Sequence, residues 1–380
     1  MDMLNFTPEE LLRYSRHFNL SQVGVTGQAK LKAAKVLCIG AGGLGSPLLL
    51  YLAAAGVGTI GIIDGDVVEA SNLQRQILFT SQDIQRKKVV AAAEHLRQLN
   101  PHIQLVLFDE LLTHDNALDI INQFDLVADG TDNFATRYLV NDACFHLKKP
   151  NVYASIFQFE GQCSIFNAQD GPCYRCLYDA PPPAGLIPNC AEGGVLGVLP
   201  GLLGTIQATE VIKYIIGAGD PLIGRLLLVN ALTMQFQVLP VLRNPNCRLC
   251  THQQAFDTLL PHHIQTCFKE NQTMDEITVK ELQQLMDQKT DFQLIDVREP
   301  HEYAICNLGG KLIPLAQLPL RLDELDELDK NQLIILHCKA GGRSMQALQL
   351  LKSAGFSNVK HVLGGVLAWA KEIDQEMTVY

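Results

Sequence analysis

Basic residues are scarce in this chain. Its 380 residues include 30 lysines and arginines against 40 aspartates and glutamates, which gives a formal net charge of −10. Because binding to a nucleic-acid backbone depends on clustered Lys and Arg, this balance argues against a direct nucleic-acid partner. It still permits a small basic pocket that holds a single nucleotide.

Long uninterrupted hydrophobic runs are also missing. The most hydrophobic stretch, residues 195–216, is interrupted by three glycines, a proline and charged side chains. It therefore predicts a buried helix and no membrane span. The first ten residues, MDMLNFTPEE, have neither a basic start nor an apolar run. We therefore expect no secretory signal and a cytoplasmic protein.

Cysteine, in contrast, is abundant. The chain has 11 cysteines, and four of them form two Cys-x-x-Cys pairs, Cys173/Cys176 and Cys247/Cys250. An odd total with two such pairs indicates metal binding and catalysis more than a disulfide scaffold. Each pair can hold a metal from one turn, and two pairs complete a tetrahedral tetrathiolate, so we expect a structural Zn²⁺ ion. Two disulfides are the alternative, which a reducing compartment disfavours.

The first part of the chain alternates short apolar runs with helical periodicity. Strands are expected at residues 35–39, 59–63, 103–108 and 126–128. Helices are expected at residues 7–34, from the turn after the first strand through residue 55, and at residues 82–99 and 117–123. Strands that alternate with helical crossovers indicate a parallel sheet covered on both faces. The pattern therefore predicts a doubly wound, Rossmann-like α/β domain at residues 1–255.

A polar stretch rich in His, Gln and Asn separates this part from a second alternation of strands and helices. A chain of 380 residues is long for one core and comfortable for two. We expect a linker at residues 256–275 and a smaller α/β domain at residues 276–380. Its helices are expected at residues 279–287 and 342–354, and its strands at residues 292–297, 333–337 and 359–363.

The segment Gly40-Ala-Gly42-Gly43-Leu-Gly45 follows the first expected strand and opens a helix. In this arrangement backbone N–H groups can approach a phosphate closely. Asp64 ends the second expected strand, where an acid can bind a ribose hydroxyl. On these features alone, an NAD-dependent oxidoreductase is the default interpretation, and a tight turn without a ligand is a further alternative.

The residues after Asp64 change that interpretation. Residues 71–76, Ser-Asn-Leu-Gln-Arg-Gln, put amides and a guanidinium into one loop, and Lys87 and Lys88 follow. Hydride transfer leaves a pyrophosphate untouched, whereas phosphoryl-group chemistry needs several cations because negative charge builds on the phosphate. Residues 129–133, Asp-Gly-Thr-Asp-Asn, offer carboxylates that could hold Mg²⁺ or could only cap the next helix. Together these groups favour a nucleoside triphosphate.

In this order, the motifs G-x-G-G-x-G, D-x-D, S-N-L-Q-R-Q, K-K and D-G-T-D-N resemble those of the MoeB/ThiF family, relatives of ubiquitin-activating enzymes, over residues 5–255. That family adenylates the C-terminal Gly-Gly of small ubiquitin-like sulfur-carrier proteins. The resemblance implies that Asp132 is the essential Mg²⁺-associated acid. Arg16 is similar to an arginine that reaches into the partner subunit's site, which implies a homodimer. The implied ATP-binding residues are Gly43, Asp64, Ser71, Asn72, Leu73, Gln74, Arg75, Lys88, Asp132 and Asn133.

Cys190 follows a loop rich in proline and glycine, residues 178–189, whose composition excludes helix and central strand. The residues alone favour an unreactive thiol at a helix start. Members of the MoeB/ThiF family, however, have a cysteine at this place that is proposed to form a thioester or persulfide with the carrier. The resemblance therefore implies a covalent catalytic role for Cys190.

Cys338-Lys-Ala-Gly-Gly-Arg343-Ser344 lies between an expected strand and an expected helix. Backbone N–H groups at a helix start would stabilise a thiolate or a persulfide there. Phosphatases have five residues between the cysteine and the arginine, whereas the four found here resemble the shorter loop of the rhodanese family. Residues 296–303, DVREPHEY, and residues 364–369, GGVLAW, resemble two further rhodanese motifs within residues 276–376. Cys306 departs from the usual rhodanese turn, and we expect it at the edge of the core.

The whole sequence predicts an enzyme with two activities. ATP with Mg²⁺ would adenylate the carrier's C-terminal glycine, and Cys338, with Arg343 beside it, would carry sulfane sulfur from a donor such as a cysteine desulfurase or thiosulfate. The product would be a thiocarboxylate on the carrier. An NAD-dependent oxidoreductase with a regulatory appendage and a zinc-stabilised redox-sensing scaffold remain alternatives. The carrier stays open, and with it the choice between molybdopterin, thiamine, cysteine and tRNA-thiolation pathways.

Overall fold

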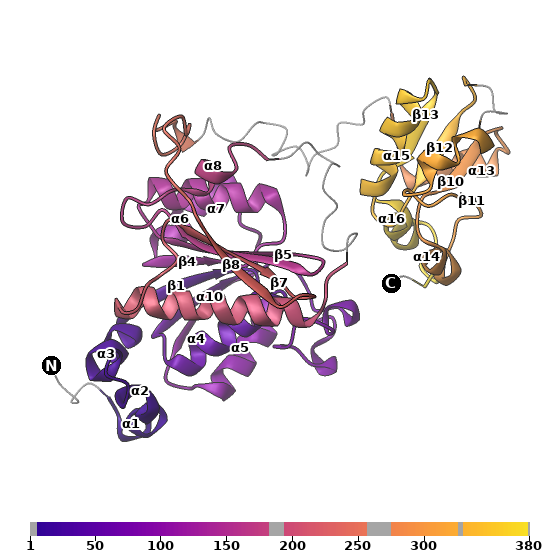
Figure 1. The fold of residues 1–380 in the computed structure, drawn as a ribbon. Helices are drawn as coiled ribbons and strands as arrows, with labels where there is room; N and C mark the ends of the chain where they lie inside the picture. Colours follow the sequence, from indigo (N-terminus) through magenta and orange to yellow (C-terminus); the bar gives the residue numbers. More distant parts are fainter. Residues whose placement is uncertain (1–5, 182–193, 257–274, 326–329, 379–380) are drawn as a thin grey trace. The chain divides into compact units, whose positions relative to one another are not determined.

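The computed structural model describes residues 6–181, 194–256, 275–325 and 330–378 (Figure 1). The described residues form two compact units, one of residues 6–181 and 194–256 and one from residue 275 onwards. Within these ranges no helix combines the length and the apolar character that crossing a bilayer requires.

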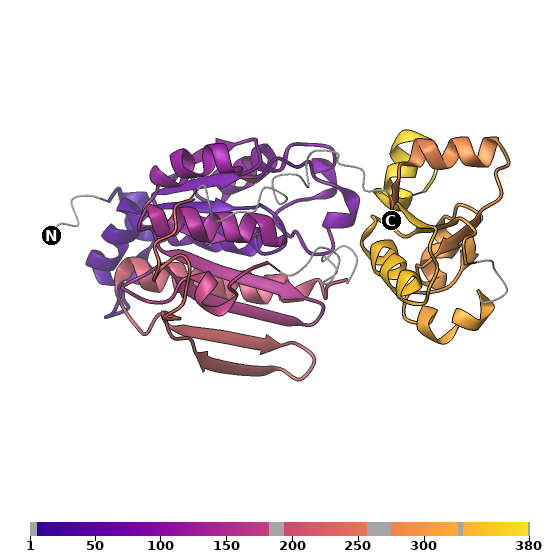
Figure 2. The same cartoon turned by 90° about the horizontal axis from the view of Figure 1, so that it is seen from above.

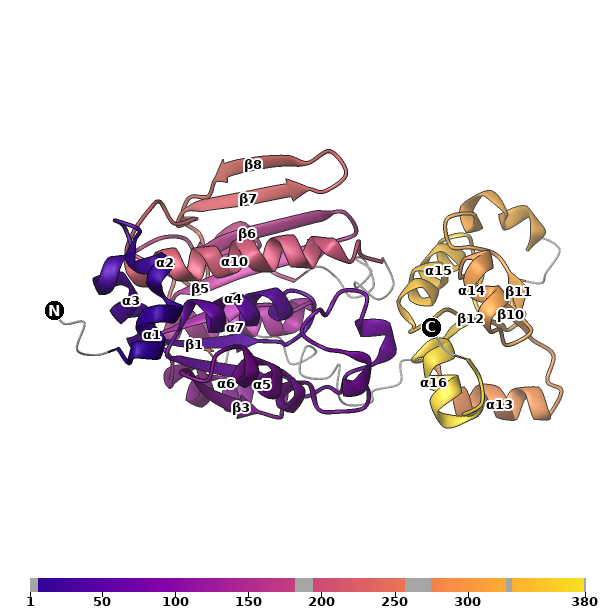
Figure 3. The same cartoon turned by 90° about the horizontal axis from the view of Figure 1, so that it is seen from below.

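The larger unit is built on an eight-stranded sheet in the order β3-β2-β1-β4-β5-β6-β7-β8 (Figure 3). Strands β1 to β5 are parallel, and β6, β7 and β8 are antiparallel to their neighbours. The strand order reverses between β1 and β4, so the carboxyl ends of these strands border the crevice where such sheets bind ligands. The strands are β1 (Lys35–Ile39), β2 (Thr59–Ile63), β3 (Gln104–Phe108), β4 (Leu126–Asp129), β5 (Asn151–Phe157), β6 (Glu160–Phe166), β7 (Arg225–Asn230) and β8 (Gln235–Pro240).

Helices cover both faces of this sheet, as Figure 1 shows. Residues of α3, α4, α5 and α10 enclose the larger apolar core on one face, and residues of α6 and α7 enclose a second core on the other. Burial on both faces explains why the parallel strands read as continuous apolar runs. The helices are α1 (Pro8–Arg13), α2 (Ser15–Phe18), α3 (Gly24–Ala33), α4 (Gly45–Ala55), α5 (Lys88–Leu99), α6 (His114–Asn122), α7 (Phe134–His146), α8 (Tyr174–Leu177) and α10 (Val198–Ile216), with short 3₁₀ turns at Ala70–Asn72 and Ser81–Asp83.

The four strands predicted in this half are confirmed as β1 to β4, and α10 confirms the buried helix. Two helix predictions are wrong in extent. Residues 7–34 form three helices, since the third starts at Gly24, whose φ of +56° does not belong to a right-handed helix. The helix predicted from residue 82 starts only at Lys88, because Gln85 has a φ of +69° and Val67 forms a bridge with Lys87.

The antiparallel half of the sheet was not predicted. Strands β5 to β8 extend the sheet beyond the parallel strands, and the β7–β8 hairpin forms its edge in Figure 2. Every residue of β8 is exposed, so this strand lacks the alternation of buried and exposed residues that marks a strand in sequence.

The smaller unit is a five-stranded parallel sheet in the order β11-β10-β12-β13-β9. Residues of α15 pack into the core on one face, and residues of α13 and α16 pack into the core on the other. The predicted strands and helices are confirmed, whereas β9, β11, α14 and α16 were not predicted as elements. The bounds are β9 (Glu276–Ile277), α13 (Val279–Asp287), β10 (Gln293–Asp296), α14 (Pro300–Ile305), β11 (Lys311–Leu312), β12 (Ile334–His337), α15 (Gly342–Ser353), β13 (Val359–Val362) and α16 (Gly365–Glu372), with 3₁₀ turns at Leu318–Leu320 and Leu322–Glu324.

Candidate functional site

The glycine-rich loop connects β1 to α4, and its shape depends on particular glycines. A Cβ atom on Gly45 would lie 2.0 Å from the carbonyl oxygen of Gly40, so only glycine permits this tight closure. A Cβ on Gly43 would lie 3.1 Å from Cβ of Pro200 and 3.6 Å from Cγ of Arg75. The loop therefore lies against the segment that contains Arg75, and it presents backbone groups at the start of α4, which suits an anion.

Asp64, at the end of β2, is fixed against this loop. Its Oδ2 accepts a hydrogen bond from the backbone N–H of Ala41 at 2.8 Å, and its Oδ1 accepts one from the N–H of Asp66 at 2.9 Å. Burial raises the pKa of the Asp64 carboxyl, while the nearby Lys88 charge and the two backbone donors act in the opposite direction. The acid thus lies where doubly wound folds bind a ribose hydroxyl.

Lys88, the first residue of α5, lies beside Asp64. Its side chain is 7% exposed, and its Nζ donates to Oδ2 of Asp66 at 2.8 Å and lies 4.0 Å from Oδ1 of Asp64. The neighbouring Lys87 is exposed and pairs with Asp109 at 3.2 Å. Of the two lysines, Lys88 is therefore the one in the predicted nucleotide site.

Residues 71–76 form a turn that packs beside the glycine loop. Asn72 is buried and its Oδ1 accepts from the N–H of Glu69, while Nη1 of Arg75 donates to the carbonyl of Ser71 at 3.1 Å. A Cβ on Gly42 would lie 3.8 Å from Nε2 of the buried Gln76. The remaining predicted residues of this turn differ in burial: Leu73 is half-buried, and Ser71 and Gln74 are exposed.

The loop after β4 reaches the same crevice. The N–H of Gly130 donates to the carbonyl of Ile39 at 3.0 Å, which joins this loop to the end of β1. Asp129 is buried, which raises the pKa of its carboxyl, and its Oδ1 accepts from the N–H and Oγ1 of Thr131. Asn133 accepts from the N–H of Thr136 as the N-cap of α7, so an amide, and neither of the two acids, caps this helix.

Asp132, between them, is exposed. In the described ranges its carboxylate has no hydrogen-bond or ion-pair partner. It is therefore the acid of this loop that is open to a metal ion, and oxygen ligands of this kind suit Mg²⁺.

One predicted catalytic residue of the described part, Arg16, is not brought to this crevice. Arg16 is exposed on α2, and the adjoining Tyr14 accepts a hydrogen bond from Asn100, which precedes β3. Arg16 thus lies near the amino ends of the strands, at the opposite end from the crevice. Cys190 lies outside the described residues.

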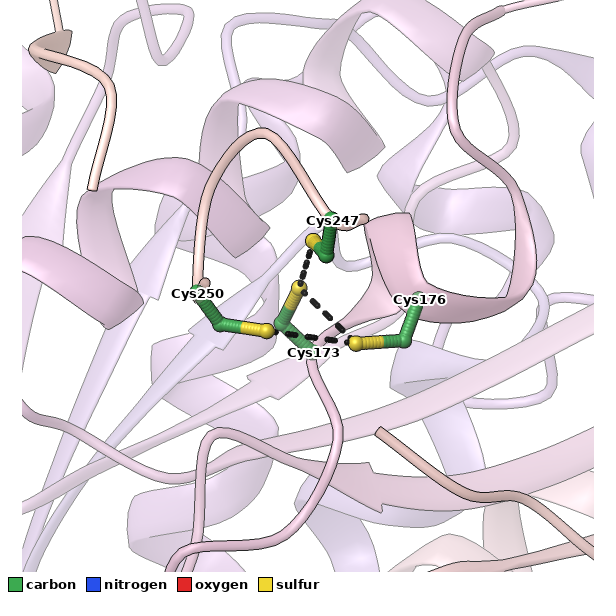
Figure 4. A group of neighbouring side chains, drawn as sticks. All are labelled: Cys173, Cys176, Cys247 and Cys250. Atoms are coloured by element: carbon green, nitrogen blue, oxygen red, sulfur yellow. Dashed lines mark hydrogen bonds between the residues drawn. The ribbon is translucent and has the colours of Figure 1, made fainter. Parts of the chain in front are cut away.

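The four cysteines of the two Cys-x-x-Cys pairs converge, as Figure 4 shows. Their sulfur atoms all lie within 4.8 Å of one another, with 3.8 Å from Cys173 to Cys176, 3.5 Å from Cys173 to Cys247 and 3.3 Å from Cys176 to Cys250. Sulfurs around a tetrahedral zinc with Zn–S bonds of about 2.3 Å are separated by roughly 3.8 Å. All four cysteines are free thiols, so the structure contains no disulfide between them, and their arrangement fits zinc.

A buried ion pair holds the first of these turns in place. Arg175, between Cys173 and Cys176, donates from Nε and Nη2 to the two carboxylate oxygens of Asp142 in α7 at 2.8 and 2.7 Å. Both side chains are almost completely buried. The turn is thereby anchored to α7, the helix that Asn133 caps.

In the smaller unit, Cys338 directly follows β12 and is buried. Its Sγ accepts from the N–H of Gly341 at 3.1 Å and lies 3.6 Å from Oγ of Ser344. Gly341 has a φ of +108°, a conformation that favours glycine. The loop thus directs the backbone N–H of Gly341 at the sulfur, which favours an anionic thiolate or persulfide.

The glycines of the GGVLAW segment support this loop from the other side. A Cβ on Gly365 would lie 2.3 Å from the carbonyl oxygen of Cys338. The N–H groups of Val366 and Leu367 donate to the carbonyls of Cys338 and Lys339 at 2.9 and 3.1 Å. The start of α16 therefore caps the carbonyls of the thiol loop.

Two ion pairs give structural roles to three charged residues of the DVREPHEY segment. Arg298 and Asp296 are fully buried and paired at 2.7 Å, and Arg298 also donates to the carbonyl of Cys306, which is itself buried. Glu302 pairs with Arg343 of the thiol loop, from Nη2 to Oε1 at 2.7 Å. The sequence predictions gave Glu302 no role, although its place in the motif, directly before the final Tyr303, was the available signal.

Comparisons with known proteins agree with this geometry. Residues 14–249 match the ThiF family and residues 278–372 match the rhodanese-like domain. A probable adenylyltransferase/sulfurtransferase MoeZ of Mycobacterium tuberculosis is 45% identical over 98% of this chain and 96% of its own length. A sulfur carrier protein adenylyltransferase of Thermus thermophilus is 49% identical over 65% of this chain and 93% of its own length.

Solved structures share the fold of the larger unit. E. coli MccB with MccA-N7isoASN has a TM-score of 0.58 and 24% sequence identity, and the match covers 65% of this chain and 76% of that one. The family expected from the sequence motifs is confirmed: the chain belongs to the ThiF family and carries a rhodanese-like domain after its ThiF region.

Proposed function

We propose that this protein adenylates the C-terminal glycine of a small ubiquitin-like sulfur-carrier protein and then transfers sulfur to it through Cys338. One observation carries the proposal. A ThiF nucleotide crevice and a rhodanese-like thiol loop occur in a single chain that matches, over 98% of its length, a relative named adenylyltransferase/sulfurtransferase.

The crevice has the groups that adenylation requires. The glycine loop and Lys88 offer backbone donors and a positive charge for the phosphates of ATP, and Asp64 offers an acceptor for the ribose. Asp132 would hold Mg²⁺, which when bound offsets negative charge on the phosphates. The carrier's terminal carboxylate oxygen then attacks the α-phosphorus, and pyrophosphate leaves with the electron pair of the broken bond.

The thiol loop supplies the sulfur. The Cys338 thiolate attacks the sulfane sulfur of a donor, such as a cysteine desulfurase persulfide or thiosulfate, and becomes a persulfide. The terminal sulfur of this persulfide attacks the carbonyl carbon of the acyl adenylate, and AMP leaves. A second thiol then breaks the sulfur–sulfur bond and releases the thiocarboxylate, and the disulfide that remains is returned to thiols by a thiol reductant. Our candidate for the second thiol is Cys190.

Three further features belong to the proposal. Zn²⁺ held by the four cysteines would pin the end of the ThiF region to its middle, without a part in the reaction. Because Arg16 is remote from the crevice of its own chain, we propose that it acts in a partner subunit of a homodimer. Four cysteines kept as thiols suit a reducing compartment, and we propose a cytoplasmic location.

The test is exchange of radiolabelled pyrophosphate into ATP, measured with each available carrier that ends in Gly-Gly. The wild-type protein should exchange in the presence of its carrier, and Asp132→Ala should not. Asp115→Ala removes a fully exposed acid in the same unit and should behave as wild type. Silence of the wild type with every carrier, together with binding of NAD, would instead support the oxidoreductase alternative.

A further inference from the structure

The thiol loop carries less positive charge than its sequence indicates, because Arg343 is engaged by a carboxylate. Nη1 and Nη2 of Arg343 donate to Oε2 and Oε1 of Glu302 at 2.5 and 2.7 Å. The two side chains are only 13% and 9% exposed, so solvent screens the pair weakly. A two-point pair of this kind neutralises the guanidinium and fixes its orientation.

Apart from Lys339, the other titratable and charged groups around the loop add no net charge to it. Lys339 is the second cation of the loop and is half-buried. His337 is buried, which lowers the pKa of its imidazole to about 4, so the ring is neutral at pH 7. Asp296 and Arg298 neutralise each other at 2.7 Å. Without Glu302, the loop would therefore gain one full positive charge.

This charge bears on the choice of sulfur donor. When the Cys338 thiolate attacks the outer sulfur of thiosulfate, the sulfur–sulfur bond breaks, sulfite leaves with the electron pair, and the cysteine keeps one sulfur as a persulfide. Thiosulfate enters as a dianion and leaves as the sulfite dianion, so its binding depends on cations in the loop. An alkanethiosulfonate gives the same persulfide but carries one negative charge fewer.

We propose that Glu302 is a positioning residue that sets donor specificity: by neutralising Arg343, it selects against dianionic sulfur donors and favours donors of lower charge. This rests on the sulfur transfer by Cys338 proposed above and adds the substrate class of that step. Glu302 acts on the donor only through Arg343.

The experiment compares thiosulfate with methanethiosulfonate as donors to cyanide, using the full-length protein and its Glu302→Gln variant. Glutamine can keep the acceptor that Glu302 gives to the N–H of Glu299, while it removes the charge and one of the two oxygens that Arg343 contacts. We expect the KM for thiosulfate to fall about tenfold and that for methanethiosulfonate about threefold, with kcat changed by less than about twofold. The gain with thiosulfate should shrink as ionic strength rises, which a purely structural effect would not do.

Matched controls test whether the effect comes from the Glu302–Arg343 pair. Glu324→Gln removes the same charge from another arginine–carboxylate pair of this unit, Nη2 of Arg321 to Oε2 of Glu324 at 3.0 Å, and should leave both KM values unchanged. Adding Glu302→Gln to Arg343→Gln should produce no further change. If Glu302→Gln does not fold, as judged by Trp369 fluorescence, Glu302→Asp should lower the thiosulfate KM by a smaller factor.

The outcomes separate the two proposals. A thiosulfate KM that is unchanged or raised in the variant, or equal gains with both donors, overturns the role of Glu302 while leaving sulfur transfer intact. Absence of thiocyanate from the wild type with both donors overturns sulfur transfer by Cys338 and this inference with it. A selective, salt-sensitive gain with thiosulfate that disappears in the Arg343→Gln background supports the inference.

Discussion

Lys87 and Lys88 carry the same charge, yet only Lys88 is buried beside the glycine loop. Its ammonium group lies between Asp64 and Asp66 at 4.0 and 2.8 Å, whereas Lys87 is 47% exposed. A cation beside a bound triphosphate stabilises the charge that develops during adenylation, and one in solvent does not. The pair therefore gives a built-in comparison for the proposed ATP site.

We predict that Lys88→Ala lowers carrier-dependent pyrophosphate exchange about 100-fold, because the variant removes the cation beside the bound triphosphate and leaves Asp64 and Asp66 without theirs. Lys87→Ala should stay within about twofold of wild type, since its charge is screened by solvent. Equal losses in the two variants, measured at saturating ATP and carrier, would contradict the assignment of Lys88.

His337 gives the smaller unit a pH dependence. Burial lowers the pKa of its imidazole from an ordinary 6.5 to about 4. The unfolded chain therefore binds one more proton than the folded chain between these values. Stability should fall as pH drops from about 6.5 towards 4, by at most about 1.4 kcal/mol per pH unit from this group.

The measurement is urea unfolding between pH 7 and pH 5, followed by fluorescence of Trp369. This is the single tryptophan of the chain, so its signal reports the smaller unit within the full-length protein. His337→Gln should flatten the pH dependence, and substitution of the exposed His301 by glutamine should not. An unchanged slope in His337→Gln would refute this origin of the pH effect.

At the scale of single residues, the sequence predicted residue types at the site better than their partners. Asp64 and Lys88 lie in the crevice as their positions in the motifs indicate, because motif spacing is local to one loop. Asn133 caps α7, and Arg343 pairs with a glutamate 41 residues away. The pairing of Arg343 joins distant elements and has no signature in local spacing, so it could not be predicted, whereas the cap that Asn133 provides to Thr136 is local.

Among the elements, α8 depends on the ion pair between Arg175 and Asp142, which is almost completely buried. Replacing Arg175 by methionine would leave the Asp142 carboxylate buried without its cation, while the thiol ligands remain. We predict that Arg175→Met lowers the free energy of unfolding of the ThiF unit by about 3–5 kcal/mol. This free energy is measured by urea unfolding with zinc present, followed by far-UV circular dichroism.

The second Cys-x-x-Cys turn supplies the control for this prediction. Arg248 pairs with Asp179 at 3.0 Å, but both side chains are about half exposed. Arg248→Met should therefore cost no more than about 1 kcal/mol. The Trp369 transition, which reports the other unit, should not move in either variant. Similar losses in the two variants would show that burial of the Arg175 pair is not what matters.

The start of α16 is the second element on which a site depends. We predict that Gly365→Ala displaces the thiol loop, because the added Cβ would lie 2.3 and 2.6 Å from the carbonyl oxygens of Cys338 and Lys339. Thiocyanate formation should fall at least about tenfold, as expected when reacting groups are misplaced by an ångström. Steady-state assays with thiosulfate and cyanide test this.

Gly309 separates this contact from backbone strain. It has a φ of +79°, against +55° at Gly365, but a Cβ added there would meet nothing within 4 Å. Gly309→Ala should therefore keep its activity and lose only about 1–2 kcal/mol of stability. Comparable losses of activity in both variants would mean that positive φ, and not contact with the loop, is responsible.

At the scale of elements, the parallel strands were predictable because burial on both faces produces unbroken apolar runs. The β5–β8 half was not, since its strands pair through hairpins and β8 is exposed throughout. The three N-terminal helices were merged into one in the prediction, because the left-handed Gly24 does not stand out among apolar residues at helical spacing.

At the scale of the molecule, each unit encloses its own apolar cores and carries its own site. Residues of the ThiF unit form two cores around the sheet with the nucleotide crevice, and residues of the smaller unit form two around the sheet that presents Cys338. Both units could be predicted from sequence motifs, because the residues of each site lie on loops at strand ends within one unit. The proposed reaction joins them through one substrate, the carrier's C-terminal glycine.

The most direct test of this account is the intact mass of a Gly-Gly carrier after incubation with the full-length protein, ATP, Mg²⁺, a sulfur donor and a thiol reductant. The account predicts a mass gain equal to the exchange of one oxygen for one sulfur, absent with Asp132→Ala and with Cys338→Ser. A carrier that stays unchanged with the wild type, or that gains sulfur with either variant, would contradict it.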